Sequence, residues 1–178
     1  MPRILVSNDD GIHAPGILAL IQVAQEFGDV TVVAPNSPQS GMGHAISVGK
    51  PIRIYEEELT EAHLRGYAVS GTPADCVKLA TGVIMKEKPD LIISGINHGF
   101  NSSVSSIYSG TLSAAREGSL QGYPSIGFSL GNYQHNADMA TAQAVARSVI
   151  AQALSQGLPG TKLLNVNVPD LTLQELKG

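Results

Sequence analysis

Short apolar runs alternate with helical patterns along this chain, and this alternation constrains its fold more than any other feature. The runs 4–7 and 29–34 are almost continuously apolar and end at turn-forming residues, as buried parallel strands do. Between them, apolar residues recur at helical spacing from residue 17 to residue 27. The first third of the chain therefore predicts a strand, a helix and a second strand, the unit of an α/β fold.

The same alternation continues to the last strand-like run of the chain. Residues 46–57 and 66–70 alternate weakly and predict a small antiparallel excursion. The remaining predicted elements are helices at 74–88, 111–121 and 137–156, strands at 90–94, 125–129 and 162–168, and a long loop at 95–110. We therefore expect one α/β domain over residues 1–178, with an open and mostly parallel sheet.

Amino-acid composition indicates a globular protein without a broad basic surface. Apolar residues make up 43% of the 178, which supports a packed core and excludes a disordered chain. The net charge is −4, so no broad basic face for a stable nucleic-acid partner is expected. Charged residues make up 15%, below the roughly 25% that is usual, which suggests that another subunit or further chain covers part of the surface.

Cysteine content and hydropathy indicate in which cellular compartment the protein is expected. Cys76 is the single cysteine, so no internal disulfide can form, and its place in a predicted helix among apolar residues indicates a structural thiol. The chain opens directly on a strand-like run, without the charged and then apolar pattern of a signal segment. No run approaches the ~20 apolar residues that span a membrane. We expect a cytoplasmic protein without a membrane partner.

Several common active-site motifs are absent from the sequence. The loop after the first strand lacks the GxGxxG pattern of dinucleotide-binding folds, and its two carboxylates would repel a bare pyrophosphate. Gly49 and Lys50 only superficially resemble the end of a phosphate-binding P-loop, because the upstream glycine is misplaced and Pro51 follows. No serine lies in the GxSxG pattern of a hydrolase nucleophile elbow.

Oxygen-bearing side chains follow three of the predicted strands. Asp9 and Asp10 come directly after the first strand, Ser40 lies in the loop after the second, and Asn97 follows the strand at 90–94. An acidic pair before glycine can be an ordinary turn, and Ser40 and Asn97 can be solvated loop residues. Because ligands bind at the carboxyl ends of strands in such sheets, we favour one Mg²⁺ or Mn²⁺ ion held by these four side chains.

A phosphate site is predicted beside this metal site. Ser109, Gly110 and Thr111 open a predicted helix, where free backbone N–H groups favour an anion, although ordinary capping explains the same residues. His44 and His98 lie in the predicted site loops and are candidates for an acid or base.

These motifs together carry a family resemblance. From Arg3 to Asp170 the chain resembles the SurE family, the stationary-phase survival proteins described as 5′/3′-nucleotidases. The resemblance rests on the segments 7–11, 34–35, 40–41, 71–77, 94–97, 108–111 and 164–169, which occur in the family's order.

The resemblance implies a function and an assembly. It implies a Rossmann-like three-layer α/β fold and hydrolysis of nucleoside 5′- and 3′-monophosphates, with short polyphosphate as a further substrate. It also implies a homodimer or homotetramer. It also implies that the divalent ion, one per subunit, is held by Asp9, Asp10, Ser40 and Asn97. Family members continue past residue 178, so we expect a C-terminal part of the family's chain to be missing here.

The candidate residues suggest a metal-assisted hydrolysis mechanism and leave two alternatives open. A divalent ion bridging the substrate phosphate and a water would activate that water, with Asp9 or Asp10 orienting the nucleophile and Ser109, Gly110 and Thr111 holding phosphate oxygens. Two alternatives are a metal-dependent nucleotide-binding regulator without turnover and a metal-dependent glycan or amide hydrolase on a similar sheet. Release of phosphate from AMP or GMP separates the first hypothesis from both.

Overall fold

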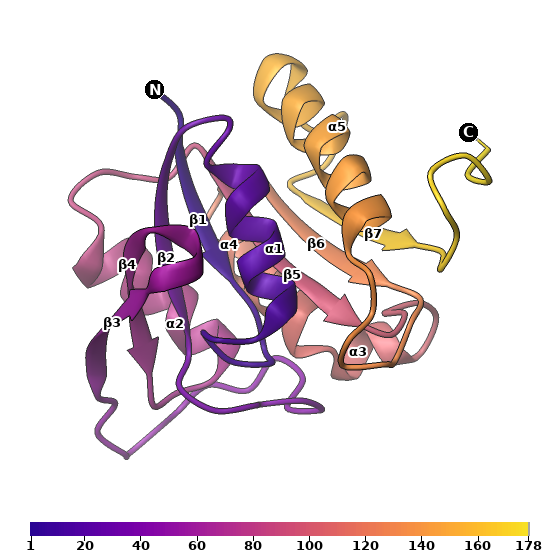
Figure 1. Cartoon of the computed structure of the whole chain (residues 1–178). Helices are drawn as coiled ribbons and strands as arrows, with labels where there is room; N and C mark the ends of the chain where they lie inside the picture. The colour runs from indigo at the N-terminus through magenta and orange to yellow at the C-terminus, as the bar shows by residue number, and fades with distance from the viewer. Residues whose placement is uncertain (178) are drawn as a thin grey trace.

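The computed structural model describes residues 1–177 as seven strands in one sheet with helices on both faces (Figure 1). The strand order is β3-β4-β2-β1-β5-β6-β7, and every neighbouring pair is parallel except β3 and β4. The strands are β1 (Arg3–Ser7), β2 (Asp29–Pro35), β3 (Ile54–Leu59), β4 (Leu64–Val69), β5 (Leu91–His98), β6 (Ser125–Leu130) and β7 (Leu163–Val168). This architecture confirms the predicted three-layer α/β fold with its antiparallel excursion.

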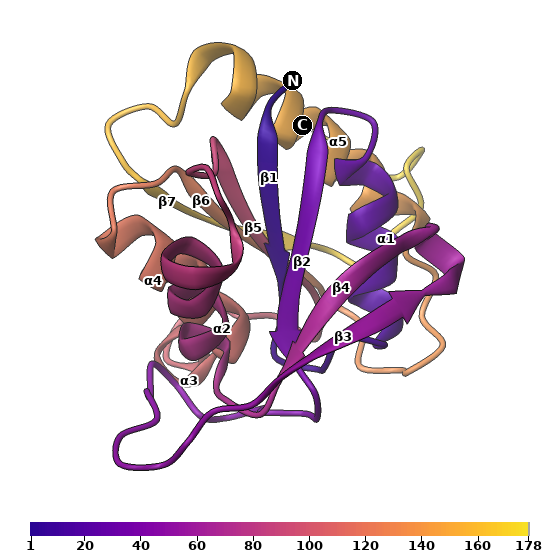
Figure 2. The same ribbon diagram turned by 90° about the vertical axis from the view of Figure 1, so that its left-hand side faces the viewer.

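The helices form two layers because alternate strand residues face opposite sides of the sheet. In β1, Ile4 and Val6 pack into the cluster that includes α1 and α5, whereas Leu5 packs into the cluster that includes α2 and α4. Figure 2 shows the sheet between these two layers. The helices are α1 (Pro15–Ala24), α2 (Pro73–Leu79), α3 (Ser105–Tyr108), α4 (Gly110–Leu120) and α5 (Ala140–Gln156), with η1 (Thr60–Ala62) and η2 (Ala80–Ile84) as short additional turns.

The structure differs from the sequence-based prediction at several places. The predicted long loop at 95–110 is wrong at its start, because β5 runs on to His98 by pairing with β6 beyond an irregularity between Ser94 and Asn97. The short helix α3 also lies within this predicted loop. The predicted helix at 74–88 is shorter, since α2 passes into a wider turn that ends at Ile84. Residues 46–53 do not join the antiparallel pair and form part of an irregular connection.

The topology places β1 at a switch point of the sheet. The chain leaves β1 toward β2 on one side and later returns to β5 on its other side. In open parallel sheets, ligands bind outside the carboxyl ends of the strands at this point. Cys76 lies far inside the α2 layer, where burial raises the pKa of its thiol. No helix among residues 1–177 is long and apolar enough to cross a membrane.

Candidate active site

The turn after β1 is built by Asn8 rather than by the acidic pair that follows it. The Asn8 amide nitrogen donates to the carbonyl of Gly11 at 2.9 Å, and its oxygen accepts from the Gly11 N–H at 3.2 Å. Gly11 has φ of +105°, which a side chain would strain. Because Asn8 and Gly11 make the turn's side-chain bonds, forming the turn does not account for Asp9 and Asp10.

Asp9 is a buried carboxylate held by the first turn of α4. The Thr111 hydroxyl donates to Asp9 Oδ1, and Gly110 approaches so closely that an added Cβ would lie 2.5 Å from Asp9 Cβ. Burial raises the pKa of Asp9 to about 6; the Thr111 hydrogen bond lowers this pKa, and the Asp10 charge raises it. An ionised Asp9 is therefore costly without a cation nearby, since burial disfavours the charged form.

Asp10 is more exposed than its neighbour. Its carboxyl group is half-buried, and this burial raises its pKa while the positive form of His135 lowers it. No hydrogen bond within residues 1–177 fixes the Asp10 carboxylate. The two adjacent carboxylates thus differ in their contacts, since α4 holds Asp9 whereas no hydrogen bond within the described residues holds Asp10.

The structure brings most of the predicted site residues to one pocket of about 300 Å³ at the carboxyl ends of β1 and β5. Of the predicted set, Asp9, Asp10, Ser40, Asn97, His98 and Ser109 line it. Gly110 and Thr111 lie behind Asp9 and do not line the pocket, and the Ser109 hydroxyl caps α4 by accepting from the Leu112 N–H at 3.1 Å. The capping alternative therefore describes Ser109, and α4 presents its first turn to the buried carboxylate.

Asn97 presents its oxygen to a ligand. Although predicted in a loop, it lies in β5, where its amide nitrogen donates to the carbonyls of His98 at 3.1 Å and Gly99 at 2.8 Å. These two bonds point the nitrogen at the backbone. Among residues 1–177 no donor occupies Asn97 Oδ1, which leaves that atom as the one available at the pocket.

Ser40 lies in the long connection between β2 and β3, which is tied down close to the pocket. The Gln39 N–H donates to the Asp9 carbonyl at 2.7 Å, and the Gly43 N–H donates to the Tyr108 carbonyl at 3.0 Å. These contacts hold the serine between the turn after β1 and the end of α3.

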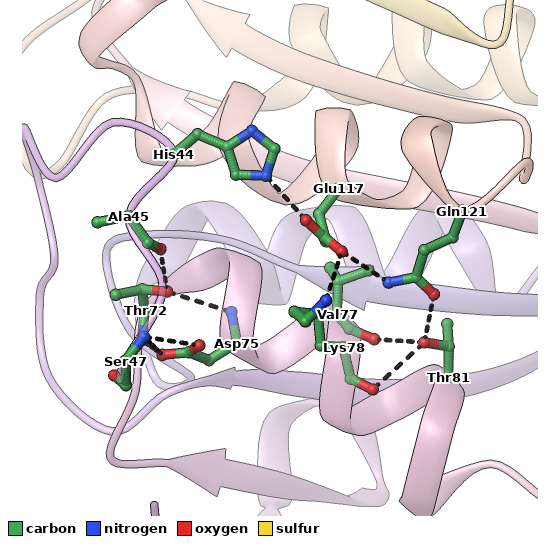
Figure 3. A network of polar contacts seen from close by, with 10 residues as sticks. All are labelled: His44, Ala45, Ser47, Thr72, Asp75, Val77, Lys78, Thr81, Glu117 and Gln121. Carbon is green, nitrogen blue, oxygen red and sulfur yellow. Dashed lines mark hydrogen bonds and ion pairs between the residues drawn. The ribbon is translucent and has the colours of Figure 1, made fainter. Parts of the chain in front are cut away.

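A polar network ties the far side of this connection to α2 and α4 (Figure 3). The Thr72 hydroxyl donates to the Ala45 carbonyl at 2.7 Å, and the Ser47 N–H donates to the Asp75 carboxylate at 3.1 and 3.2 Å. Asp75 also accepts from the Thr72 N–H at 2.9 Å, which completes the capping box of α2. The connection that carries Ser40 therefore rests on defined contacts along much of its length.

His44 belongs to this network and does not line the pocket. Its Nε2 lies 2.9 Å from the buried carboxylate of Glu117 in α4, which also accepts from Gln121 at 2.9 Å and pairs with Lys78 at 3.4 Å. Burial raises the pKa of Glu117, but the bonds from Gln121 and His44 and the charge of Lys78 outweigh this and leave the pKa lowered. The contacts of His44 are those of an anchor for the connection.

His98 remains at the pocket. Its Nε2 is buried and has no hydrogen-bond partner within residues 1–177. Burial lowers the pKa of His98, and the charge of His135 lowers it further, so the neutral ring is favoured. His98 lines the pocket as a residue, although its Nε2 atom is itself buried.

Three groups of site residues escaped the sequence prediction. Glu117 partners His44 from 73 residues away, and Asn101 fixes the loop after β5 by donating from its N–H to Asn167 at 2.8 Å and from its amide to Ser129 at 3.0 Å. The third group is the pocket's aromatic rings, Phe100, Tyr108 and Tyr133. None of these three groups has a local sequence signal; the capping-box spacing of Thr72 and Asp75 marks only the start of α2.

The donors fit a hard divalent cation. Two carboxylates, a hydroxyl and an amide oxygen form an all-oxygen set, and the buried Asp9 charge calls for a cation. Within residues 1–177 no three His, Cys, Asp or Glu side chains come together as a metal cluster, so any ion here would depend on the neutral oxygens as well.

Comparison with known proteins decides the family. The sequence profile described as "Survival protein SurE" matches residues 4–178. A protein of Flavobacterium psychrophilum named "5'-nucleotidase SurE" is 52% identical over 177 residues, which cover 99% of this chain and 69% of that protein. This chain belongs to the SurE family. A SurE relative of the same printed name from Christiangramia forsetii is also 52% identical, with 99% and 68% covered.

A solved SurE structure agrees with this membership. The crystal structure of the SurE protein from Aquifex aeolicus matches with a TM-score of 0.88 and 39% identity, covering 99% of this chain and 70% of that one. The three-layer α/β fold is thus that of the SurE family. The predicted resemblance is confirmed.

Proposed function

We propose that this chain is a divalent-metal-dependent 5′-nucleotidase that hydrolyses nucleoside 5′-monophosphates, and also 3′-monophosphates, to nucleoside and phosphate. The observation that carries the proposal is the convergence of Asp9, Asp10, Ser40 and Asn97 on one pocket at the switch point of the sheet. SurE relatives about 50% identical carry the name 5′-nucleotidase, which supports this reaction over hydrolysis of glycans or amides.

In this proposal, Asp9, Asp10, Ser40 and Asn97 hold one Mg²⁺ or Mn²⁺ ion. The Asn97 Oδ1 and the Asp10 carboxylate, neither of which is hydrogen-bonded within residues 1–177, support that assignment. When bound, such an ion polarises a phosphoryl oxygen and lowers the pKa of a coordinated water.

The protein's own groups position the reactants. Thr111 and Gly110 fix Asp9, so its charge stays at one place in the pocket, while Asp10 orients the attacking water. Ser109, the N-cap of α4, lines the pocket; its hydroxyl oxygen accepts from the Leu112 N–H, and its hydroxyl proton donates to a phosphate oxygen in this proposal. His98 lines the pocket and is the candidate acid or base in this proposal.

Ser40 serves as a ligand rather than as a nucleophile in this proposal. A serine nucleophile needs a base within hydrogen-bond reach. His44, the base suggested by the sequence, is bonded to Glu117 instead. The contacts of Gln39 and Gly43 fix the loop around Ser40 without a strand-to-helix elbow.

We further propose a cytoplasmic homodimer or homotetramer with short polyphosphate as an additional substrate. Exposed apolar side chains on α3, the preceding loop and α4, among them Val104, Ile107 and Leu120, support burial against another copy. The single buried Cys76 supports a reducing compartment.

A phosphate-release panel tests the proposed function. AMP, GMP, CMP, 3′-AMP and tripolyphosphate are each incubated with the protein and Mg²⁺ or Mn²⁺. We expect release from the 5′-monophosphates in the presence of either ion. Saturable AMP binding without phosphate release would contradict the proposal and indicate a nucleotide-binding regulator.

A further inference from the structure

Two aromatic rings beside the pocket each pack against a glycine in the loop that carries the other ring. The Tyr133 ring, after β6, packs on Gly99, where an added Cβ would lie 2.2 Å from the ring. The Phe100 ring, after β5, packs on Gly131, where an added Cβ would also lie 2.2 Å from the ring. The loop after β5 and the loop after β6 therefore pack against each other through these two rings at the pocket.

The pocket gathers an unusual share of the chain's aromatic residues. The sequence has three phenylalanines, five tyrosines and no tryptophan, and three of these eight rings line the one pocket. Phe100 is 40% exposed, Tyr108 59% and Tyr133 75%. Rings kept this exposed beside two carboxylates contribute little to the core, and aromatic faces in a polar pocket are suited to a flat ligand.

Tyr133 is the ring best placed for such a ligand. It lines the main pocket and also an adjoining cavity of about 230 Å³, and the two cavities share Asp10, His98 and Tyr133. Its contact with Gly99 orients the ring, while its high exposure leaves ring surface open to solvent. A molecule with an anionic end at the cation proposed beside Asp10 and a flat end toward the adjoining cavity would therefore reach Tyr133.

We propose that Tyr133 stacks against the nucleobase of a nucleoside monophosphate whose phosphate lies at Ser109 and at the cation assigned to Asp9 and Asp10, an inference that rests on the proposed function. Stacking on a ring face tolerates every base, because all bases present a π-surface. The site therefore recognises a nucleotide over a base-free phosphate ester without selecting one base.

Kinetics with matched substrates test the inference. AMP is compared with ribose 5-phosphate, which keeps the phosphate ester and the sugar but lacks the base. For Tyr133→Ala we expect the ratio of kcat/KM for AMP to kcat/KM for ribose 5-phosphate to fall about tenfold, mainly through the KM for AMP. Tyr133→Phe keeps the ring and should keep the ratio, as should Tyr55→Ala, which removes an exposed tyrosine from the edge strand β3.

Two results would overturn the inference. An equal loss on both substrates would mean that the ring only supports Gly99 and the end of β5, and an unchanged ratio would mean that the base does not meet Tyr133. Calorimetric binding of AMP and ribose 5-phosphate to the same variants gives the comparison without turnover. A wild-type protein that binds AMP but releases no phosphate would refute the proposed function, and the binding ratio would still decide the role of Tyr133.

Discussion

Asp9 and Asp10 are neighbours in sequence but have different environments. Thr111 and Gly110 hold Asp9 in a buried position, whereas the Asp10 carboxylate has no such restraint within the described residues. The difference suggests two roles: Asp9 holds a negative charge at a fixed place in the pocket, whereas the Asp10 carboxylate adjusts its position to the bound ion. Changes at Asp10 and changes to the contacts of Asp9 should therefore affect different properties, namely cation affinity and the rate of hydrolysis.

Asp10→Asn should keep the fold and lose cation binding. The side chain is half-buried and supports no core packing, so the free energy of unfolding should change by less than about 1 kcal/mol. Affinity for Mn²⁺, measured by calorimetry, should fall roughly tenfold or more, because hard cations respond to ligand charge. Wild-type Mn²⁺ affinity in this variant would place the metal site elsewhere.

Gly110→Ala tests the contact that fixes Asp9. The new Cβ would lie 2.5 Å from Asp9 Cβ, so the carboxylate must shift. A displacement of about 1 Å at a reacting group can cost about 100-fold in rate, and we expect a loss of that order in kcat for AMP. Gly82→Ala is the matched control, since a Cβ there meets nothing within 4 Å. Equal activity of the two variants would contradict the positioning role of Gly110.

At the scale of elements, the connection between β2 and β3 depends on contacts with α2 and α4. Its residues form no strand of their own before Ile54, yet Gly43, His44, Ala45 and Ser47 each bond to another part of the fold. The position of Ser40 is therefore set by the connection's partners and not by a local motif.

His44→Ala should loosen this connection. One bond to a charged group is removed while the contacts at Ala45 and Ser47 remain, so the Mn²⁺ concentration for half-maximal activity should rise about threefold to tenfold. His63→Asn, a change at an exposed histidine with φ of 51°, serves as control. An unchanged Mn²⁺ requirement would show that the bond to Glu117 does not position Ser40.

Asp75→Ala should destabilise the fold in a pH-dependent manner. Burial raises the pKa of Asp75, but bonds from Ser47 and Thr72 outweigh it and hold the pKa below its usual 3.8. The ionised form thus stabilises the folded state above about pH 4, and this stabilisation fades as the pH falls through the folded-state pKa.

We therefore expect Asp75→Ala to lower the free energy of unfolding by about 2 kcal/mol at pH 7, measured by urea denaturation, and by less at pH 3. Asp29→Ala, at an exposed carboxylate, should change it by less than about 0.5 kcal/mol at pH 7. A penalty for Asp75→Ala that does not shrink with acid would argue against the charge-assisted bonds.

At the scale of the whole molecule, the sequence alone predicts the order of elements and the class of fold. Strand-like apolar runs mark β1, β2, β6 and β7 in the sequence. These four strands therefore match their predicted ranges to within one residue at each end. The extension of β5 through Gly95 and Asn97 was missed, because those turn-forming residues continue the strand only through pairing with β6. Tertiary pairing here overrides local preference.

The candidate site was predictable where strand ends supply it and unpredictable where distant contacts do. Asp9, Asp10 and Asn97 follow from the rule that ligands bind at the carboxyl ends of strands. The partners of Asp9 and His44 lie 102 and 73 residues away along the chain, and no periodicity encodes such pairs. The aromatic rings of the pocket likewise follow no periodic pattern, since Phe100 and Tyr133 lie in loops and Tyr108 ends the short helix α3.

Metal removal tests the central claim most directly. Phosphate release from AMP is measured on protein stripped with excess EDTA and again after Mg²⁺ or Mn²⁺ is restored. Because the pocket is lined by Asp9 and Asp10 and by no lysine or arginine, no side chain there can take the place of the cation. We predict that EDTA abolishes release and that either ion restores it. Full turnover in excess chelator would contradict the account.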